Sequence, residues 1–538
     1  MHFILRLVGG ESLGQSTKIV KSSAVMAVAT LTSRVLGLVR EQAIAMIFGA
    51  SSLTDAFWVA YRIPNMLRDL FAEGSFSSAF VPVLSEELRK SDEDGRNLFW
   101  SVFLLLLIIT STIAICVLIF SSQIVQFIAP SFSQNPEQFL IASNLVKLMA
   151  FFLPFVSIAA LAMGGLNTKK LFFLPAMAPA SFNIIMIFCI FGLTGYLKSN
   201  DIQNIYALGI GVLFGGFFQF FVQLPSLLKN GYEFKAKINL NSPQLKRILK
   251  RLGIGTIGIA ATQINLLINT FLATSAGVGA VSFLSFGMRL FQFPVGILGV
   301  SISGANLVYF SEKWKESNKE EAIKILKSSY YLSLFVMIPA TLFLFAFSRE
   351  IVMLIFERGS FDYIAGNNTS IALDCYLFGL PSYGLYKIFG PTFYAIDREK
   401  LPIFISIFSI FVNIIFCITL TPIYGFKILA LGTSISMILN SFLQMVFISR
   451  EIKIGLDFFI NVKITKLIIV NIFIFIITLI SKNKIYEHFK VDQFFVTAIF
   501  VTLSFFLFII FYFLLMTLLG DKELVVSFLK KMKKRLSK

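Results

Sequence analysis

Histidine, cysteine and charge are all scarce in this sequence. Only two of the 538 residues are histidine, one at the N-terminus (His2) and one in a predicted loop (His488), which disfavours histidine-based acid–base or metal chemistry. The four cysteines fall inside apolar runs without metal-ligand spacing, so we expect buried free thiols. No glycine-rich nucleotide loop with its lysine is present. The sequence therefore predicts no metal site, no catalytic residues, no bound cofactor and no ATP hydrolysis.

Charged residues make up only 14% of the chain, against about a quarter in soluble proteins, and hydrophobic residues make up 57%. Mean hydropathy is +0.81. Apolar runs such as 98–120, 328–347 and 493–519 each match the roughly 20 helical residues that cross a hydrocarbon core. The runs are solid rather than alternating, which excludes a transmembrane β-barrel. We therefore expect an all-α polytopic membrane protein.

The net charge of +18 lies where membrane proteins carry positive charge. Much of it is in short loops and in the C-terminal tail KKMKKRLSK, where each basic residue near anionic headgroups contributes about 1 kcal/mol. Basic and aromatic residues do not interleave in a separate domain, so we expect no nucleic-acid partner. The acidic run at 92–94 lies among basic residues, which favours a solvated loop over a metal site. The N-terminal MHFILRLVGG has too short an apolar stretch for a cleaved signal peptide, so we expect the first span to be retained.

The apolar runs predict about fourteen transmembrane helices. Their approximate cores are 22–48, 55–85, 98–120, 138–162, 171–195, 205–228, 248–274, 279–310, 328–347, 368–395, 402–421, 427–449, 464–481 and 493–519. Basic loops alternate with loops that lack lysine and arginine, for example 229–251 against 49–54 and 274–281. This alternation and the even number of spans place both termini in the cytoplasm. The loop with Lys482 and Lys484 opposes the rule.

The chain contains an internal repeat. DAFWVAYRIPNMLRDLF, starting at Asp55, aligns with SFLSFGMRLFQFPVGIL, starting at Ser282, an offset of 282 − 55 = 227. The matched pairs are Asp55 with Ser282, Arg62 with Arg289, Asn183 with Asn413 and Gly209 with Gly432. Six spans separate the copies, so the copies run parallel, and substrate sites in such folds lie between the halves.

Spans and repeat together predict the domain organisation. We expect a cytoplasmic N-terminal segment (1–21), an N-lobe with spans one to six (22–230), a cytoplasmic linker (231–247), a C-lobe with spans seven to twelve (248–450), two added spans (451–519) and a basic cytoplasmic tail (520–538). Pro64 and Pro294 follow the repeated arginines, and we expect them to break their helices. Broken helices that line a cavity are typical of transporters.

The first lobe carries charge inside its predicted spans. Arg34 and Arg40 lie twelve and eighteen residues into an apolar segment that begins near residue 22. A charge at mid-membrane usually faces a water-filled cavity or a partner. Asp55 and Arg62 are seven residues apart and therefore share a helix face. The arginine fork suits phosphate, so an excess of arginine predicts an anionic ligand, although structural ion pairs and helix-end positions stay open as alternatives.

These segments resemble a known family. SRVLGLVRE, FGASSLTDAFWVAYRIPNMLRDLFAEGSFSSAFVPVLSE, FERGSF and FYAIDREKLP are similar to the MurJ (MviN) family of bacterial lipid II flippases, within the multidrug/oligosaccharidyl-lipid/polysaccharide exporter superfamily. The resemblance covers the chain after about residue 20. It implies a fourteen-helix fold with two six-helix lobes around a central cationic cavity, and a lipid-tail groove formed by the last two helices. It also implies a monomer in the bacterial inner membrane, surrounded by membrane lipids, that serves peptidoglycan synthesis, cell-wall biogenesis and cell shape.

The substrate implied by the resemblance is lipid II, undecaprenyl-pyrophosphoryl-MurNAc-pentapeptide-GlcNAc, which alternating access would move to the periplasmic leaflet. The resemblance and the repeat together give the candidate substrate-binding residues Arg34, Arg40, Glu41, Asp55, Arg62, Arg68, Ser282, Arg289 and Lys387. Met288 and Gln292 stand where relatives often carry acids, which makes the second lobe more cationic. Gln263 stands in the seventh span, where part of the family has an acid for sodium. Coupling to an ion or to the membrane potential is therefore left open.

Three alternatives to lipid II flipping follow from the same residues. A cation-coupled drug exporter of this superfamily would need acids in the cavity, whereas the predicted cavity is cationic. A flippase for another polyprenyl-linked saccharide shares the electrostatics. A membrane enzyme on polyprenyl phosphates would need a catalytic acid or histidine set, which the sequence does not offer.

Overall fold

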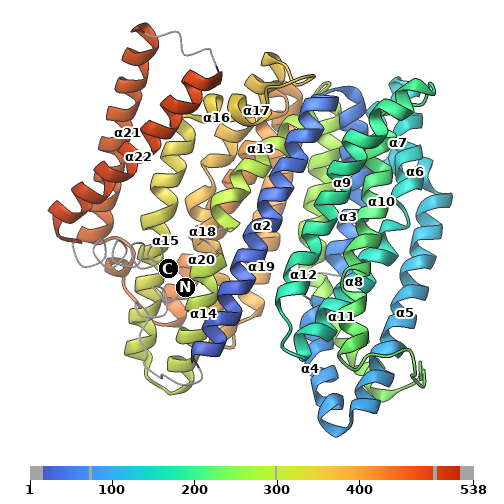
Figure 1. The fold of residues 1–538 in the computed structure, drawn as a ribbon. Coiled ribbons are helices and arrows are strands. Elements are labelled where there is room, and N and C mark those ends of the chain that lie inside the picture. The colour runs from blue at the N-terminus through green and yellow to red at the C-terminus, as the bar shows by residue number, and fades with distance from the viewer. Residues whose placement is uncertain (1–15, 72–74, 297–299, 489–493, 522–538) are drawn as a thin grey trace. The chain divides into compact units, whose positions relative to one another are not determined.

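A computed structural model describes residues 16–71, 75–296, 300–488 and 494–521 of the chain. These residues are almost entirely helical and contain no β-strand (Figure 1), which confirms the predicted all-α class. Long apolar runs fold this way because a helix satisfies all of its backbone polar groups internally, as a membrane interior requires. The fourteen predicted spans each correspond to one helix or to consecutive helices, so the fold is consistent with the predicted count.

The first half contains α2 (Ser16–Phe48), α3 (Ser52–Phe71), α4 (Ser75–Lys90), α5 (Asp92–Ile119), α6 (Ser121–Ile128), α7 (Pro136–Met149), α8 (Phe152–Thr168), α9 (Phe173–Ser199), α10 (Tyr206–Phe221) and α11 (Leu224–Lys229). The second half contains α12 (Pro243–Ser275), α13 (Ala280–Pro294), α14 (Val300–Lys315), α15 (Lys319–Ala346), α16 (Ser348–Phe356), α17 (Tyr363–Leu377), α18 (Leu380–Ala395), α19 (Lys400–Tyr424) and α20 (Lys427–Glu451), followed by α21 (Val462–His488) and α22 (Phe494–Met516). Short 3₁₀ turns at Pro130–Gln134 and Leu456–Phe458 and a π turn at Thr517–Asp521 complete the described elements.

Nine helical segments among the described residues are long and apolar enough to cross a membrane. The five other predicted spans begin near residues 22, 55, 248, 279 and 368, and their helices are interrupted, more polar or more charged. All nine candidate binding residues lie on four of these five spans. The candidate binding residues therefore lie on spans that are less apolar than the other membrane segments.

Two repeat-equivalent spans each include residues outside the described part of the chain. Residues 72–74 separate α3 from α4, and residues 297–299 lie between α13 and α14. Helical turns continue past Pro294 through residues 295–296, and the next residues, 297–299, lie outside the described part of the chain, so the break predicted at Pro294 stays a prediction. The same prediction for Pro64 is wrong, since that residue lies inside the continuous α3. Later turns of α3 continue past it because a proline costs one backbone hydrogen bond, which packing can offset.

The described helices form two compact units. The N-terminal unit contains residues 17–285 together with 358–362, and the C-terminal unit contains residues 286–357 and those from 363 onward. The N-terminal unit therefore includes α12 and the first turns of α13. This division follows contacts rather than the repeat, so the repeat-based lobes stay a prediction.

The predicted linker after α11 packs against the N-terminal unit. Trp100 Nε1 donates to the carbonyl oxygen of Glu233 at 2.8 Å, and the backbone N–H of Asn239 donates to Ser101 Oγ at 2.9 Å. Tyr232 is fully buried, and its hydroxyl lies 2.9 Å from Thr168 Oγ1. Burial raises the pKa of Tyr232 to about 12, so the phenol stays neutral and holds this contact at all physiological pH values.

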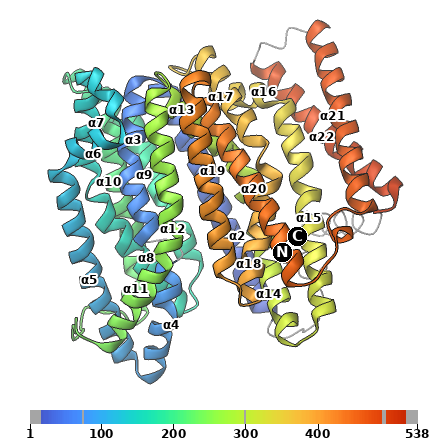
Figure 2. The same ribbon diagram turned by 180° about the vertical axis from the view of Figure 1, so that it is seen from behind.

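In the C-terminal unit, α21 and α22 lie side by side next to α15 in both views (Figures 1 and 2). Phe343 on α15 contacts the rings of Phe505 and Phe508 on α22. The Tyr512 hydroxyl donates to the Phe335 carbonyl oxygen at 2.7 Å. One face of the helix pair is thus packed on the unit, while many large apolar side chains on its other faces are exposed, as a lipid environment allows.

Candidate functional site

A polar stripe runs along one face of α3. Asp55, Arg62 and Asp69 are spaced by seven residues, about two helical turns, so their side chains point the same way. The predicted shared face of Asp55 and Arg62 is therefore present. In the N-terminal unit this face is turned toward α12 and the start of α13, as the following contacts demonstrate.

Asp55 binds the first turn of α13. Its Oδ2 accepts from the backbone N–H of Gly279 at 2.7 Å, and its Oδ1 accepts from the N–H and the hydroxyl of Ser282 at 2.9 and 2.7 Å. Asp55 is 2% exposed and Ser282 is fully buried. A carboxylate at a helix N-terminus satisfies free N–H groups and opposes the positive end of the helix dipole. Two residues that the repeat makes equivalent thus bind each other.

The next two members of the stripe contact α12. Arg62 Nε donates to Thr270 Oγ1 at 3.2 Å, and Gln263 Nε2 donates to Asp69 Oδ2 at 3.2 Å. Thr270 and Gln263 are also seven residues apart, so α12 presents a matching polar face. Gln263 therefore serves as a partner of Asp69 in this structure.

A backbone clasp joins the end of α2 to the loop between α16 and α17. The N–H of Ser360 donates to the Met46 carbonyl oxygen at 2.8 Å, and the Ser360 hydroxyl donates to the Ile47 carbonyl oxygen at 3.0 Å. Gly359 and Gly49 make this approach possible, with φ of +61° and +64°. A Cβ on Gly359 would lie 2.2 Å from the Met46 oxygen, and one on Gly49 would lie 2.3 Å from the Ser360 oxygen. Glycine is therefore required on both sides of the clasp.

Arg40 is held inside the N-terminal unit. It is 7% exposed; its Nη2 lies 2.5 Å from Glu41 Oε1, and its Nη1 donates to Asn183 Oδ1 at 3.1 Å. Its guanidinium also lies over the Phe182 ring, 5.6 Å from the centroid. Asn183 in turn donates to the Ser33 carbonyl oxygen at 3.1 Å. Both terminal nitrogens of Arg40 are thus engaged here, so a role in substrate binding stays a prediction and would require this network to open.

The two remaining arginines of the first half are more accessible. Arg34 is half-buried on α2 and has no hydrogen bond or ion pair within the described part of the chain. Arg68 is half-buried as well, and its Nη2 lies 2.8 Å from Asp69 Oδ1. The Arg68 Nε also donates to Asp69 Oδ1, at 3.2 Å, so a phosphate would have to compete with this carboxylate for the Arg68 guanidinium.

The last two candidates belong to the C-terminal unit. Arg289 is half-buried on α13. Lys387 on α18 places its Nζ over the rings of Tyr383 and Tyr386, 5.4 and 5.8 Å from their centroids. A cationic cavity shared by both units stays a prediction. Among the described residues, no three acidic, histidine or cysteine side chains form a metal-binding group.

Sequence reasoning missed several residues of this region. Asn183 appears in the repeat alignment, yet nothing in the pattern pairs it with Arg40. Positive-φ glycines 49, 279 and 359 carry a weak signal, because glycine next to small polar residues often marks a tight turn. Thr270 could have been found only from the heptad match between α3 and α12.

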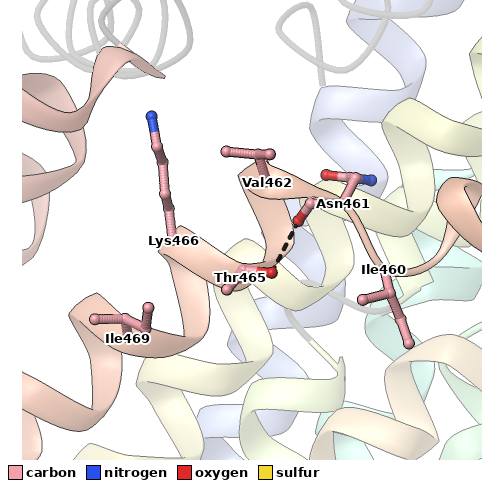
Figure 3. A pocket seen from close by; sticks show the side chains of 6 residues that line it. All are labelled: Ile460, Asn461, Val462, Thr465, Lys466 and Ile469. Atoms are coloured by element: carbon pink, nitrogen blue, oxygen red, sulfur yellow. Dashed lines mark hydrogen bonds between the residues drawn. The ribbon is translucent and has the colours of Figure 1, made fainter.

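A separate open pocket of about 370 Å³ lies at the start of α21. Figure 3 shows Lys466 extending from the helix while Thr465 bonds back to the Asn461 carbonyl oxygen. The Lys466 amine already donates to the Leu519 carbonyl oxygen at 2.8 Å. The pocket is lined by one short stretch of chain, residues 460–469, and contains none of the candidate residues.

Comparison with known proteins gives one consistent answer. A family model described as "Lipid II flippase MurJ" matches residues 44–501. The chain is 35% identical over 426 residues to the probable lipid II flippase MurJ of Buchnera aphidicola subsp. Schizaphis graminum, covering 79% of this chain and 82% of that protein. It is 34% identical over 419 residues to the lipid II flippase MurJ of Burkholderia cenocepacia, covering 77% and 80%.

Solved structures agree. A structure described as lipid II flippase MurJ in an inward closed conformation has a TM-score of 0.77 and 26% identity, covering 93% of this chain and 99% of that one. An inward-facing multidrug resistance MATE family transporter of the MOP superfamily has a TM-score of 0.64 at 15% identity, covering 79% and 98%, which shows a shared fold alone.

Proposed function

Because this chain belongs to the MurJ family of lipid II flippases, we propose that it carries lipid II from the cytoplasmic to the periplasmic leaflet of the bacterial inner membrane. Membership of this family confirms the predicted flippase class, a transporter rather than an enzyme, with a part in peptidoglycan synthesis. The single observation that carries the proposal is the family match over most of the chain. The charged residues on the polar spans are consistent with it.

The pyrophosphate of lipid II is the group that the arginines recognise in this proposal. It carries about two negative charges, and each charge-assisted hydrogen bond contributes roughly 1.5 to 3 kcal/mol. Arg34 and Arg68 supply accessible guanidinium groups in the N-terminal unit, and Arg289 and Lys387 supply cations in the C-terminal unit. The excess of cations disfavours a cationic drug as substrate.

Alternating access requires contacts that form in one state and break in another. The Asp55 cap on α13 and the Ser360 clasp on α2 are suited to this, because both join segments of the two sequence halves through a few hydrogen bonds. We propose that these two contacts form an outer gate that opens and closes during the transport cycle. Opening exchanges these bonds for bonds to water, so the gate costs little net energy to break.

The binding proposal is tested by Arg289→Ala in a strain depleted of its own flippase. Losing one bidentate arginine should weaken binding about 10- to 100-fold, so we expect lipid II to accumulate and growth to fail, with normal protein in the membrane. Arg289→Lys should rescue in part, because lysine keeps the charge but lacks the fork. The matched control is Lys313→Ala, which removes a half-buried cation that pairs with Glu316 in the last turn of α14. Normal growth of Arg289→Ala would contradict the proposal.

The proposed orientation places both termini in the cytoplasm. Single cysteines at Val278 and Leu240, which are 72% and 41% exposed, report on opposite sides of the membrane. The native cysteines are replaced first, because Cys116 is exposed. We expect Val278→Cys to react with an impermeant thiol reagent in intact cells and Leu240→Cys to react only after permeabilisation. The reverse pattern would invert the topology.

A further inference from the structure

A proline lies inside α18, one helical turn after Lys387. The helix runs without interruption from Leu380 to Ala395, and Pro391 is within it. In an α-helix, the backbone N–H at position 391 would donate to the carbonyl oxygen of Lys387, four residues earlier, but proline has no N–H. The Lys387 carbonyl therefore lacks its helical partner and needs another donor, because an unsatisfied backbone group is unfavourable inside a membrane span.

Ser303 on α14 provides that donor. Its hydroxyl donates to the Lys387 carbonyl oxygen. Both residues are half-buried, and both belong to the C-terminal unit. Serine and threonine side chains are among the groups that satisfy the backbone carbonyls freed by proline in membrane helices. The Ser303 hydroxyl thus takes the place of the N–H that Pro391 lacks.

A second contact joins the same two helices next to the first. Asn306 Nδ2 donates to Thr392 Oγ1 at 3.0 Å, and Thr392 Oγ1 donates to the Ile388 carbonyl oxygen at 2.8 Å. Asn306 and Thr392 are both fully buried. Ser303 and Asn306 are three residues apart on α14 and therefore share a face. This face of α14 holds α18 at residues just before and just after Pro391.

The turn of α18 that Ser303 holds carries the Lys387 side chain. The ammonium lies over the rings of Tyr383 and Tyr386, and the Phe291 ring on α13 meets the Tyr383 ring edge-on, with 5.8 Å between centroids. Lys387 forms no ion pair within the described part of the chain. A half-buried ammonium on a membrane span, without a carboxylate partner, suits an anionic ligand.

We propose that Ser303 is a positioning residue for lipid II binding, because its bond to the Lys387 carbonyl fixes the turn of α18 that presents the Lys387 ammonium to the pyrophosphate. This inference rests on the proposed function, and Ser303 acts through Lys387 without touching the substrate. Without the hydroxyl, the freed carbonyl has no donor, so the turn before Pro391 relaxes and the ammonium loses its fixed position. A misplaced cation binds more weakly even though its charge remains.

The first test is a double-mutant cycle on the equilibrium binding of fluorescent lipid II to the purified full-length protein. Ser303→Ala should weaken binding about 2- to 10-fold, as expected for one lost hydrogen bond. Pro391→Ala restores the backbone N–H, so Ser303→Ala should cause no further loss in that background. Ser303→Thr keeps a hydroxyl and should bind like the wild type. An equal loss from Ser303→Ala with and without Pro391 overturns the proposal.

A second cycle separates positioning from general stability. Lys387→Ala should weaken lipid II binding, and Ser303→Ala should weaken it no further in that background, because the serine acts only through the lysine. The thermal midpoint should respond differently. Ser303→Ala should lower it in both backgrounds, since the carbonyl of residue 387 belongs to the backbone. If Ser303→Ala weakened binding equally with and without the lysine, its role would be structural and the positioning proposal would be wrong.

The matched control is Ser409→Ala on α19. Ser409 is fully buried, and its hydroxyl donates to the Ile405 carbonyl oxygen at 2.8 Å. The backbone N–H of Ser409 is the helical donor for the same carbonyl, so removing this hydroxyl frees no backbone group. We expect Ser409→Ala to leave lipid II binding unchanged in both the wild type and Pro391→Ala. A loss as large as that of Ser303→Ala would contradict a specific role for Ser303.

Failure of this inference is distinguishable from failure of the proposed function. Normal lipid II binding by Lys387→Ala overturns the inference, while the flippase function, which Arg289→Ala tests, stands. A wild type that binds no lipid II refutes the proposed function and this inference with it. In that case the thermal midpoints of the Ser303 and Pro391 variants still decide whether the hydroxyl replaces the missing N–H.

Discussion

The two halves of the repeat place their aligned asparagines, Asn183 and Asn413, in different surroundings. In the first half, Asn183 on α9 accepts a hydrogen bond from Arg40, whose charge is balanced by Glu41. In the second half, Asn413 on α19 is fully buried and accepts from the Cys417 thiol at 3.3 Å. A Cβ on Gly432 would lie 2.5 Å from Asn413 Oδ1, so the second site is tightly packed.

Alignment of the two halves therefore does not imply the same chemistry at the aligned positions. The two aligned asparagines lie on aligned helices, but Asn183 lies beside the Arg40–Glu41 ion pair, whereas Asn413 accepts from a thiol. An ion pair inside a unit is costly to build and costly to break on one side, whereas a thiol contact is weak in both respects. We therefore expect substitutions in the first half to have the larger effects.

Among these substitutions, Arg40→Ala should have the largest effect on stability and growth. Removing the guanidinium leaves Glu41 buried without its cation and Asn183 without its donor, at a cost of about 3 to 5 kcal/mol. We expect a lower thermal midpoint of the purified protein and no growth of a flippase-depleted strain. Arg40→Lys should recover part of both, since lysine keeps the charge.

Cys417→Ala is the counterpart in the second half. It removes only a weak sulfur donor from Asn413, so its cost should be about 1 kcal/mol or less. Equal losses in the two variants would mean that the ion pair is not what distinguishes the halves.

The clasp offers a second comparison, between Gly359 and Gly425. Both have positive φ, +61° and +74°, but a Cβ on Gly359 meets the Met46 oxygen at 2.2 Å, whereas Gly425 has open space around it. Alanine at either position pays about 1–2 kcal/mol of backbone strain. Only Gly359→Ala must also displace the α2 backbone, so only it should lower the thermal midpoint further and impair growth. If Gly425→Ala lowered the thermal midpoint and growth as much as Gly359→Ala, the clasp would not be the cause of the Gly359→Ala defect.

The sequence predicted the helices and the shared face of Asp55 and Arg62, because both follow from local periodicity. It could not predict that this face contacts Thr270 and the first turn of α13, since partners far along the chain depend on which helices pack together. Self-comparison made Asp55 and Ser282 equivalent, but nothing in an alignment says that equivalent residues touch. For the same reason the pairing of Lys482 with Glu350, far apart in the chain, was beyond the sequence.

The acidic run at 92–94 was predicted to lie in a solvated loop; its residues are exposed, but the prediction of a loop is wrong. These residues form the first turn of α5, where the Ser91 hydroxyl accepts from the N–H of Asp94 at 3.0 Å. Serine followed by acids is a helix N-cap signal, because the acids oppose the positive end of the helix dipole. The high polarity of the run concealed that signal.

Asp92→Ala should have the smallest effect, because we expect exposed ion pairs to contribute equally little in the two halves. Asp92 is exposed and pairs with Lys169 at 2.9 Å, and Glu320 in the second half is likewise exposed and pairs with Lys324 at 2.8 Å. Water screens both pairs, and ordering two long side chains offsets most of the attraction. We expect Asp92→Ala and Glu320→Gln to leave the thermal midpoint and growth unchanged, with no dependence on salt. If Asp92→Ala alone stopped growth, the first half would differ from the second at its surface as well as in its interior.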